Sequence, residues 1–225
     1  MPDKDENFYA GHRDRLRDKF VSNQLADYEK LELLLAYAIP RRDVRPLARS
    51  LVKRFGGVYR VLSASIDDLI TVNGIGRNTA IFLKLVQQMM TINYKSQLAE
   101  TPIFHDENIL HNYCRIMMAG KSIEELHILY LDNNLKLICD EIHTIGTIDT
   151  SAVYPREIAR RALDKNARSI VMVHNHPASH NSFSNDDIEM TRIVKSVLLT
   201  LNIEFYDHLV VSNDVVYSAR QMHLI

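Results

Sequence analysis

The sequence places two histidines, a serine and an aspartate at a spacing that could build a metal centre. His174 and His176 lie in a His-Asn-His-Pro run that closes a short apolar stretch, and Ser184 and Asp187 follow with Ser-x-x-Asp spacing. Histidines at i and i+2 at the end of a strand point to one side. Zn²⁺ accepts imidazole and carboxylate, and three such ligands leave one tetrahedral position open, as in catalytic zinc sites. The pattern therefore predicts zinc held by His174, His176 and Asp187.

Each part of this pattern also has a plainer interpretation. His-x-His alone is more often part of a turn, and Ser184-x-x-Asp187 alone is a capping box, in which Ser184 caps a helix and Asp187 complements its dipole. The two interpretations are compatible, because a helix N-terminus can position Asp187 while a metal binds it. Zinc lowers the pKa of a bound water to about 7, which provides hydroxide at neutral pH.

The elements that would position these residues are strands and helices of the C-terminal half. Apolar or alternating runs predict strands at 127–131, 135–139, 169–173, 203–206 and 209–211. Helices are expected over about 155–166, with a proline near the first position, and over about 185–201. This half is therefore an α+β or α/β domain, and His174 directly follows its buried strand 169–173.

The N-terminal half has a different period. From Gly11 to about Thr91 apolar residues recur at helical spacing, which predicts a small all-α bundle. The residues with this spacing are Leu31, Leu34, Leu35, Ala38, Leu47, Leu51, Phe55, Leu69, Val72, Ile81, Leu85 and Met89. The period is lost beyond Asn93. We therefore predict a helical domain at 1–92, a linker at 93–104 and a second domain at 105–225.

A glycine hairpin lies between two helices of the N-terminal half. Gly74 and Gly76 permit a tight turn, and the helix that starts near Arg77 offers free N–H groups, which commonly bind phosphate. The stretch resembles the helix-hairpin-helix motif, which grips nucleic acid by its backbone. Arg77 and, nearby, Lys84 favour such contact. The plainer alternative is that the glycines only let two helices pack closely.

Charge is distributed unevenly between the two halves. Residues 1–100 carry 16 Lys and Arg against 12 Asp and Glu, whereas residues 101–225 carry 11 against 16. The run 12–19 alternates in sign, which is typical of a solvated helix face. A phosphate-binding face that includes Arg41, Arg42 and Arg45 is the alternative. The difference in charge does not by itself establish contact with DNA.

Composition excludes several classes of protein. The 225 residues are 46% hydrophobic and 24% charged, which excludes disordered and collagen-like chains. Cys114 and Cys139 form no CxxC motif, so neither a disulfide framework nor a thiolate zinc site is predicted. The charged N-terminus lacks the apolar core of a signal peptide, and no run reaches the roughly 18 apolar residues of a membrane span. We expect a cytoplasmic protein without a membrane segment.

Further residues around these motifs repeat a known pattern. In the C-terminal half they are Asp132, Glu141, Gly146, Thr147, Val153, Pro155, Arg156, Glu157, Arg161, Asn166, His174, His176, Ser184, Asp187, Thr191, Asp207 and His208. In the N-terminal half they are Gly11, Arg13, Leu16, Asp27, Glu29, Leu31, Pro40, Arg42, Asp43, Gly74 and Gly76. Together they resemble the RadC family over nearly the whole chain. The His-x-His-Pro and Ser-x-x-Asp spacing resembles the JAMM metalloprotease motif.

The resemblance implies a fold class and an assignment of roles. It implies an α+β protein, in which an all-α helix-hairpin-helix domain precedes an α/β, cytidine-deaminase-like JAB/MPN domain with a mixed sheet flanked by helices. His174, His176 and Asp187 match the zinc ligands. Glu141 matches the general base that takes a proton from the zinc-bound water, with Asp140 as the alternative. Ser184 matches the serine that stabilises the oxyanion.

Two further histidines are assigned on the same resemblance. His208 matches a family Asp-His pair, and we expect it to be bonded to a carboxylate rather than to act directly. His180 is expected in an exposed loop and not as a fourth ligand. That loop departs from the family pattern at Ala178-Ser179 and Phe183, although its length is kept.

The function predicted from all this is that of a zinc-dependent metallopeptidase-like hydrolase. A metal-bound water activated by Glu141 would attack a peptide or isopeptide carbonyl, and its protein or peptide substrate stays open. The alternative is a DNA-associated protein whose zinc site is structural or vestigial, with nucleic acid bound through Gly74, Gly76 and Arg77. An oligomer is compatible with either function.

Overall fold

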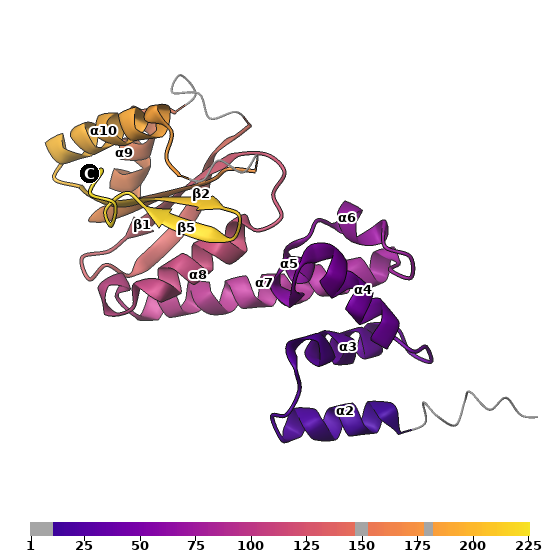
Figure 1. Ribbon diagram of the computed structural model, residues 1–225. Coiled ribbons are helices and arrows are strands. Elements are labelled where there is room, and N and C mark those ends of the chain that lie inside the picture. The colour runs from indigo at the N-terminus through magenta and orange to yellow at the C-terminus, as the bar shows by residue number, and fades with distance from the viewer. Residues whose placement is uncertain (1–10, 147–152, 178–181) are drawn as a thin grey trace, which may run out of the picture. The chain divides into compact units, whose positions relative to one another are not determined.

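The computed structural model describes residues 11–146, 153–177 and 182–225, in two compact units, Met1–Met89 and Met90–Ile225 (Figure 1). The 24-residue helix α7 (Arg77–Glu100) contributes to both units. No helix in the described ranges is long and apolar enough to cross a membrane. Both cysteines are free.

The N-terminal unit is the expected helical bundle. Its other described helices are α2 (His12–Val21), α3 (Asp27–Ala38), α4 (Arg45–Phe55), α5 (Val58–Ser63) and α6 (Ile66–Ile70). Pro46 lies in the first turn of α4, where its fixed φ suits a helix, and Gly56 ends that helix with a φ of 87°. Leu31, Leu35, Leu51 and Leu83 lie in the core, each no more than 1% exposed.

Helix α7 shows that not every periodic apolar residue faces a core. Ile81, Leu85 and Met89 are 44%, 47% and 52% exposed, whereas Ala80 and Leu83 are fully buried. Apolar residues occur on more than one face of this helix. The period alone therefore does not identify the face that packs.

The C-terminal unit is a three-layer α/β domain built on a mixed sheet. The strands are β1 (Glu125–Leu131), β2 (Leu137–Ile145), β3 (Ser169–Asn175), β4 (Glu204–Ser212) and β5 (Val215–Ser218). Their order is β2-β1-β3-β4-β5, and the β3–β4 pair alone among them is parallel. Helices α9 (Pro155–Asp164) and α10 (Asn185–Thr200) cover one face, and α8 (Glu107–Met118) covers the other (Figure 1). The predicted α+β class and the mixed sheet flanked by helices are confirmed.

The prediction of an irregular linker at 93–104 is wrong. Helix α7 continues to Glu100, and a 3-10 turn follows at Ile103–His105. Leu98 and Ile103 are each 1% exposed and lie in the core beneath α8. The polar residues of this stretch face solvent while a few apolar ones pack, so its composition conceals the helix. Helix α8 was also not predicted.

Candidate metal centre

Two secondary-structure elements bring the predicted ligands together. His174 lies near the end of β3, where all seven residues are buried, and His176 follows directly after the strand. Asp187 lies in the first turn of α10. A strand end and a helix start therefore meet at one point on the sheet, and the three side chains form the group of His and acidic residues that could hold a metal ion in the described part of the chain.

The spacing of the ligand atoms suits zinc. The Nε2 atoms of His174 and His176 are 2.9 Å apart. Asp187 Oδ1 lies 3.2 Å from His174 Nε2, and Asp187 Oδ2 lies 3.4 Å from His176 Nε2. Tetrahedral zinc with bonds of 2.0–2.1 Å requires ligand atoms separated by about 3.3 Å. The two Nε2 atoms and one carboxylate oxygen of Asp187, all within 4.8 Å of one another, can take three corners of such a tetrahedron without a change of fold.

Asp187 is held in place by the helix cap. Ser184 donates from its backbone N–H and from its hydroxyl to Asp187 Oδ2, each at 2.7 Å, and the Asp187 N–H donates back to Ser184 Oγ at 3.1 Å. Burial by itself would raise the pKa of Asp187, but the adjacent imidazoles of His174 and His176 and the hydrogen bond from Ser184 outweigh it and hold that pKa well below its usual range. The capping box therefore coexists with the ligand geometry.

A buried histidine lies behind the first ligand. His208, on β4, places its Nε2 2.8 Å from His174 Nδ1, and its Nδ1 2.6 Å from Thr191 Oγ1. The expected bond between His208 and a carboxylate is present, but it does not involve the ring. The neighbouring carboxylate of Asp207 instead accepts from the His208 backbone N–H. Burial lowers the pKa of His208 well below its usual value, and the charge of His174 lowers it further.

Asn175, between the two histidines, fastens the strand end. Its Oδ1 accepts from the Glu125 N–H at 2.9 Å, and its Nδ2 donates to the Ile123 carbonyl at 3.0 Å. The side chain is buried, so these bonds are shielded from water. Asn175 thus ties the segment before β1 to the end of β3 and limits the movement of both histidines.

The sheet register separates Glu141 from Asp140. Glu141 pairs with Ile128, which pairs with Met172 on β3, and Leu126 pairs with His174. Directly paired residues project from the same face of a sheet, so Glu141 and His174 share a face. Asp140 projects from the opposite face, where it pairs with Lys95. This excludes Asp140 as a partner of the three ligands.

Glu141 is not placed against the ligands in this structure. Its Oε1 pairs with Lys165 Nζ at 2.6 Å, and it lines a hollow of about 300 Å³ with residues of β2 and α9. Its position on β2 is separated from His174 by about 10 Å across the sheet and about 7 Å along the strands. The general base thus remains a prediction supported by its shared face.

The comparisons with known proteins agree with this architecture. A model of the RadC-like JAB domain family matches residues 104–224. The chain is 36% identical over 235 residues to UPF0758 protein FN0909 of Fusobacterium nucleatum, covering 100% of both chains. It is 37% identical over 217 residues to UPF0758 protein SPO0054 of Ruegeria pomeroyi, covering 95% of this chain and 97% of that one. The chain belongs to the RadC family.

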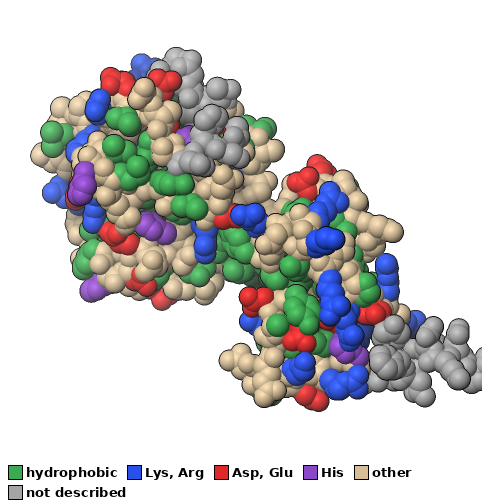
Figure 2. Space-filling view, viewed as in Figure 1, with side chains coloured by type: hydrophobic (Ala, Val, Ile, Leu, Met, Phe, Trp, Pro, Cys, Tyr) green, Lys and Arg blue, Asp and Glu red, His purple; other side chains and the backbone are tan. Residues whose placement is uncertain are grey.

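In this RadC-family chain the hairpin residues lie at the start of α7. Arg77 and Gly76 are exposed, and Gly74 has a φ of 96°. The Arg42 guanidinium covers Gly74 so closely that a Cβ there would lie 3.0 Å from it. The loop that carries Arg41 and Arg42 and the glycine hairpin, although distant in sequence, are therefore neighbours. Figure 2 shows several other Lys and Arg side chains on the visible face of this unit.

Several of the other cations of the RadC-family chain have structural partners. Lys84 Nζ donates to the carbonyls of Leu62 and Ser63, at the end of α5. Arg13 donates to carbonyls at and after the end of α3. Arg45 pairs with buried Glu32 at 3.6 Å, and that carboxylate also contacts His12 at 2.6 Å. These bonds hold α2, α3 and α4 together and engage His12 and Arg13 within the protein. The other charged residues of the run 12–19 are exposed, namely Asp14, Arg15, Arg17, Asp18 and Lys19.

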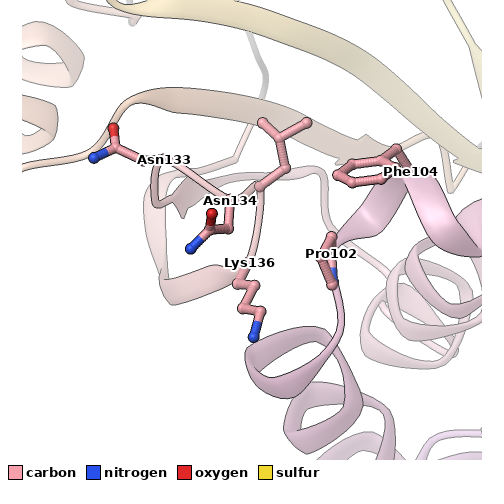
Figure 3. A pocket seen from close by; sticks show the side chains of 6 residues that line it. Pro102, Phe104, Asn133, Asn134 and Lys136 are labelled. Atoms are coloured by element: carbon pink, nitrogen blue, oxygen red, sulfur yellow. The ribbon is translucent and has the colours of Figure 1, made fainter.

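Two further features of the RadC-family chain lie apart from the metal centre. A hollow of about 530 Å³ is lined by residues around the β1–β2 turn and the 3-10 turn, Phe104 and Lys136 among them (Figure 3). It lies at the opposite end of β1 from the residue that pairs with His174. His180 falls outside the described residues.

Proposed function

We propose that this protein is a cytoplasmic zinc-dependent hydrolase that cleaves a peptide or isopeptide bond. The observation that supports it best is the convergence of His174, His176 and Asp187: the two Nε2 atoms are 2.9 Å apart, and the two Asp187 oxygens lie 3.2 and 3.4 Å from them. Three protein ligands leave a coordination position for substrate or water, which is the arrangement of a catalytic rather than a structural zinc site. We propose the physiological substrate only as a chemical class, a polypeptide with a peptide or isopeptide carbonyl.

The chain's own residues divide the reaction between them. Bound zinc supplies a Lewis acid that polarises a carbonyl and makes water more acidic. Glu141 takes the proton of the attacking water, which requires its carboxylate to leave Lys165 and turn along the shared face towards His174. The Ser184 hydroxyl, at the exposed start of α10, donates to the developing oxyanion and exchanges its bond to Asp187 for this role.

The test separates metal binding from catalysis. Elemental analysis of protein purified without chelators should find one zinc per chain, and His174→Ala, His176→Ala and Asp187→Ala should each lose it. His105→Ala, at an exposed histidine, is the matched control and should keep the metal. A wild-type protein without zinc would overturn the proposal.

A peptidase screen then tests the assignment of the base. Glu141→Gln should keep the zinc and lose turnover by about 100-fold or more, as expected for a general base. Asp140→Asn, on the other face of the sheet, should keep both zinc and turnover, with its folding checked by circular dichroism. Equal activity of wild type and Glu141→Gln would remove Glu141 from the mechanism and leave the metal site untouched.

A second candidate function, binding of a nucleic-acid backbone, is favoured by one observation in the N-terminal unit. Arg42 lies against Gly74, which is three residues before the exposed Arg77 at the start of α7. Phosphate groups would be neutralised there without base contacts. Duplex DNA should bind with an affinity that falls as salt rises, and Arg77→Glu and Arg42→Glu should each weaken it. Absence of binding at low salt would eliminate this function.

A further inference from the structure

Behind the metal centre, a chain of hydrogen bonds leads from one ligand to another. His174 Nδ1 lies 2.8 Å from His208 Nε2, and His208 Nδ1 lies 2.6 Å from Thr191 Oγ1. The Thr191 hydroxyl in turn donates to the backbone carbonyl of Asp187 at 2.6 Å. His174 and Asp187 are therefore joined twice, once where their side chains face each other and once through His208 and Thr191.

The direction of each hydrogen bond follows from the carbonyl at the end of the chain. A carbonyl oxygen only accepts, so the single proton of Thr191 Oγ1 points to Asp187. Thr191 Oγ1 must then accept from His208 Nδ1–H. A neutral imidazole with a proton on Nδ1 has its acceptor at Nε2, so His208 accepts from His174 Nδ1–H. That leaves His174 Nε2 without a proton, on the side of Asp187.

We propose that Thr191 and His208 are positioning residues that hold His174 in the tautomer able to bind zinc through Nε2. The inference rests on the proposed zinc site. The inference goes beyond the zinc site because it assigns the selection of the tautomer to two residues that touch neither metal nor substrate. Partners of this kind orient a ligand imidazole and increase its basicity.

The closed loop of hydrogen bonds joins residues of three separate elements, so it can position the metal ligands relative to one another. His174 belongs to β3, His208 to the parallel strand β4, and Asp187 and Thr191 to α10. His208 pairs with Met172 across the sheet, which places it on the face that α10 covers. Because this loop of hydrogen bonds closes on the Asp187 backbone, it fixes the start of α10 relative to the end of β3.

Burial makes each hydrogen bond of this loop difficult to replace by a bond to water. His174 and His208 are fully buried and Thr191 is 1% exposed. The Phe183 ring packs edge-on against His208, with centroids 5.1 Å apart. With little access for water, removal of one partner leaves a buried N–H without an acceptor. Loss of such an outer partner typically weakens metal binding by about 10-fold to 100-fold.

The experiment measures zinc affinity in the full chain by competition with a chromophoric chelator at one neutral pH. Thr191→Val removes the hydroxyl and keeps the shape, and it should weaken zinc binding by about 10-fold. His208→Phe keeps a ring and removes the acceptor, and the loss should be about 10-fold to 100-fold. His208→Gln restores an acceptor and should recover part of that loss.

The double variant distinguishes a relay from two independent packing effects. Once His208 is replaced by Phe, Thr191 has no imidazole to orient, so adding Thr191→Val should change zinc affinity by less than about 3-fold. Multiplication of the two single losses would overturn the proposal. The nitrogen NMR shifts of the His208 ring in the zinc-loaded protein should report a proton on Nδ1, and a proton on Nε2 would also overturn it.

Controls keep this result separate from the proposed function and from folding. Ser169→Ala removes a buried hydroxyl from the far end of β3 and should leave zinc affinity unchanged. Thermal unfolding of the metal-free variants checks that each one folds. If the wild type binds no zinc, the proposed function fails. If the wild type binds zinc and Thr191→Val binds it equally well, the relay alone fails.

Discussion

Removing the hydroxyl of Ser184 should destabilise the C-terminal unit even when no metal is bound. In Ser184→Ala the Asp187 N–H loses its acceptor, and Asp187 Oδ2 loses one of the two donors that hold it at 2.7 Å. The bond from the Ser184 backbone N–H to the same oxygen remains. The substitution therefore removes half of the capping box and leaves the rest in place.

The magnitude follows from these two lost bonds. Loss of a helix N-cap costs about 0.5–2 kcal/mol. A hydrogen bond to a charged group contributes about 1.5–3 kcal/mol. Ser184 is exposed, so water replaces part of the lost donor, and the lower ends of both ranges apply. We expect the free energy of unfolding to fall by about 2 kcal/mol.

The assay is equilibrium urea unfolding of the full chain in the presence of a chelator, followed by hydrogen exchange of the α10 amides. Exchange identifies the unit that unfolds, because the two units can unfold in separate transitions. Ser196→Ala is the matched control, since the same substitution within the same helix removes only a hydroxyl that bonds the Ile193 carbonyl. Ser184→Thr should keep the cap. A loss below about 0.5 kcal/mol for Ser184→Ala would refute the reasoning.

Three other predictions follow from the same structure. Because the pKa of Asp187 is depressed in the folded protein, its contribution to stability is complete above the unfolded pKa of about 3.9 and is lost as the pH falls further. In Asp187→Asn, the free energy of unfolding of the metal-free protein should therefore fall less steeply between about pH 5 and pH 3 than in the wild type. Leu51→Ala, at a fully buried position, should cost the N-terminal unit about 2–5 kcal/mol by calorimetry while zinc content stays unchanged; a loss of zinc would contradict the separation of the two units. Gly74→Ala, at a φ of 96° and against Arg42, should destabilise the same unit by about 1–2 kcal/mol in urea, and an unchanged midpoint would show that the hairpin relaxes.

Local patterns identify four of the five strands, with the runs at 203–206 and 209–211 joined in the single strand β4, but they miss β5 and α8. Alternating and apolar runs identified β1, β3 and β4 because a pleated strand repeats its environment every second residue. Helices α9 and α10 followed from their periodicity and from Pro155 and Ser184 at their starts. The continuation of α7 through 93–100 did not follow, because Leu98 is buried by residues distant in the sequence. Composition was a poor guide where a helix serves two units.

The candidate ligands were the part of the site that spacing alone could identify. His174 and His176 are two residues apart, and Asp187 lies in the capping box of the next helix, so short-range geometry restricts them to one place. The choice between Glu141 and Asp140 needed the register of β2 against β1 and β3, because adjacent residues of a strand face opposite sides of the sheet.

The sequence by itself therefore determined the fold class, the family and three ligand types at a spacing that fits zinc. Only the tertiary structure decided what supports them. His208 and Thr191 lie 17 residues apart and His174 lies 34 residues from His208. They meet because β4 pairs in parallel with β3 while α10 crosses over both. No local period encodes such a meeting, since it arises from the order of strands in the sheet, which long-range packing determines.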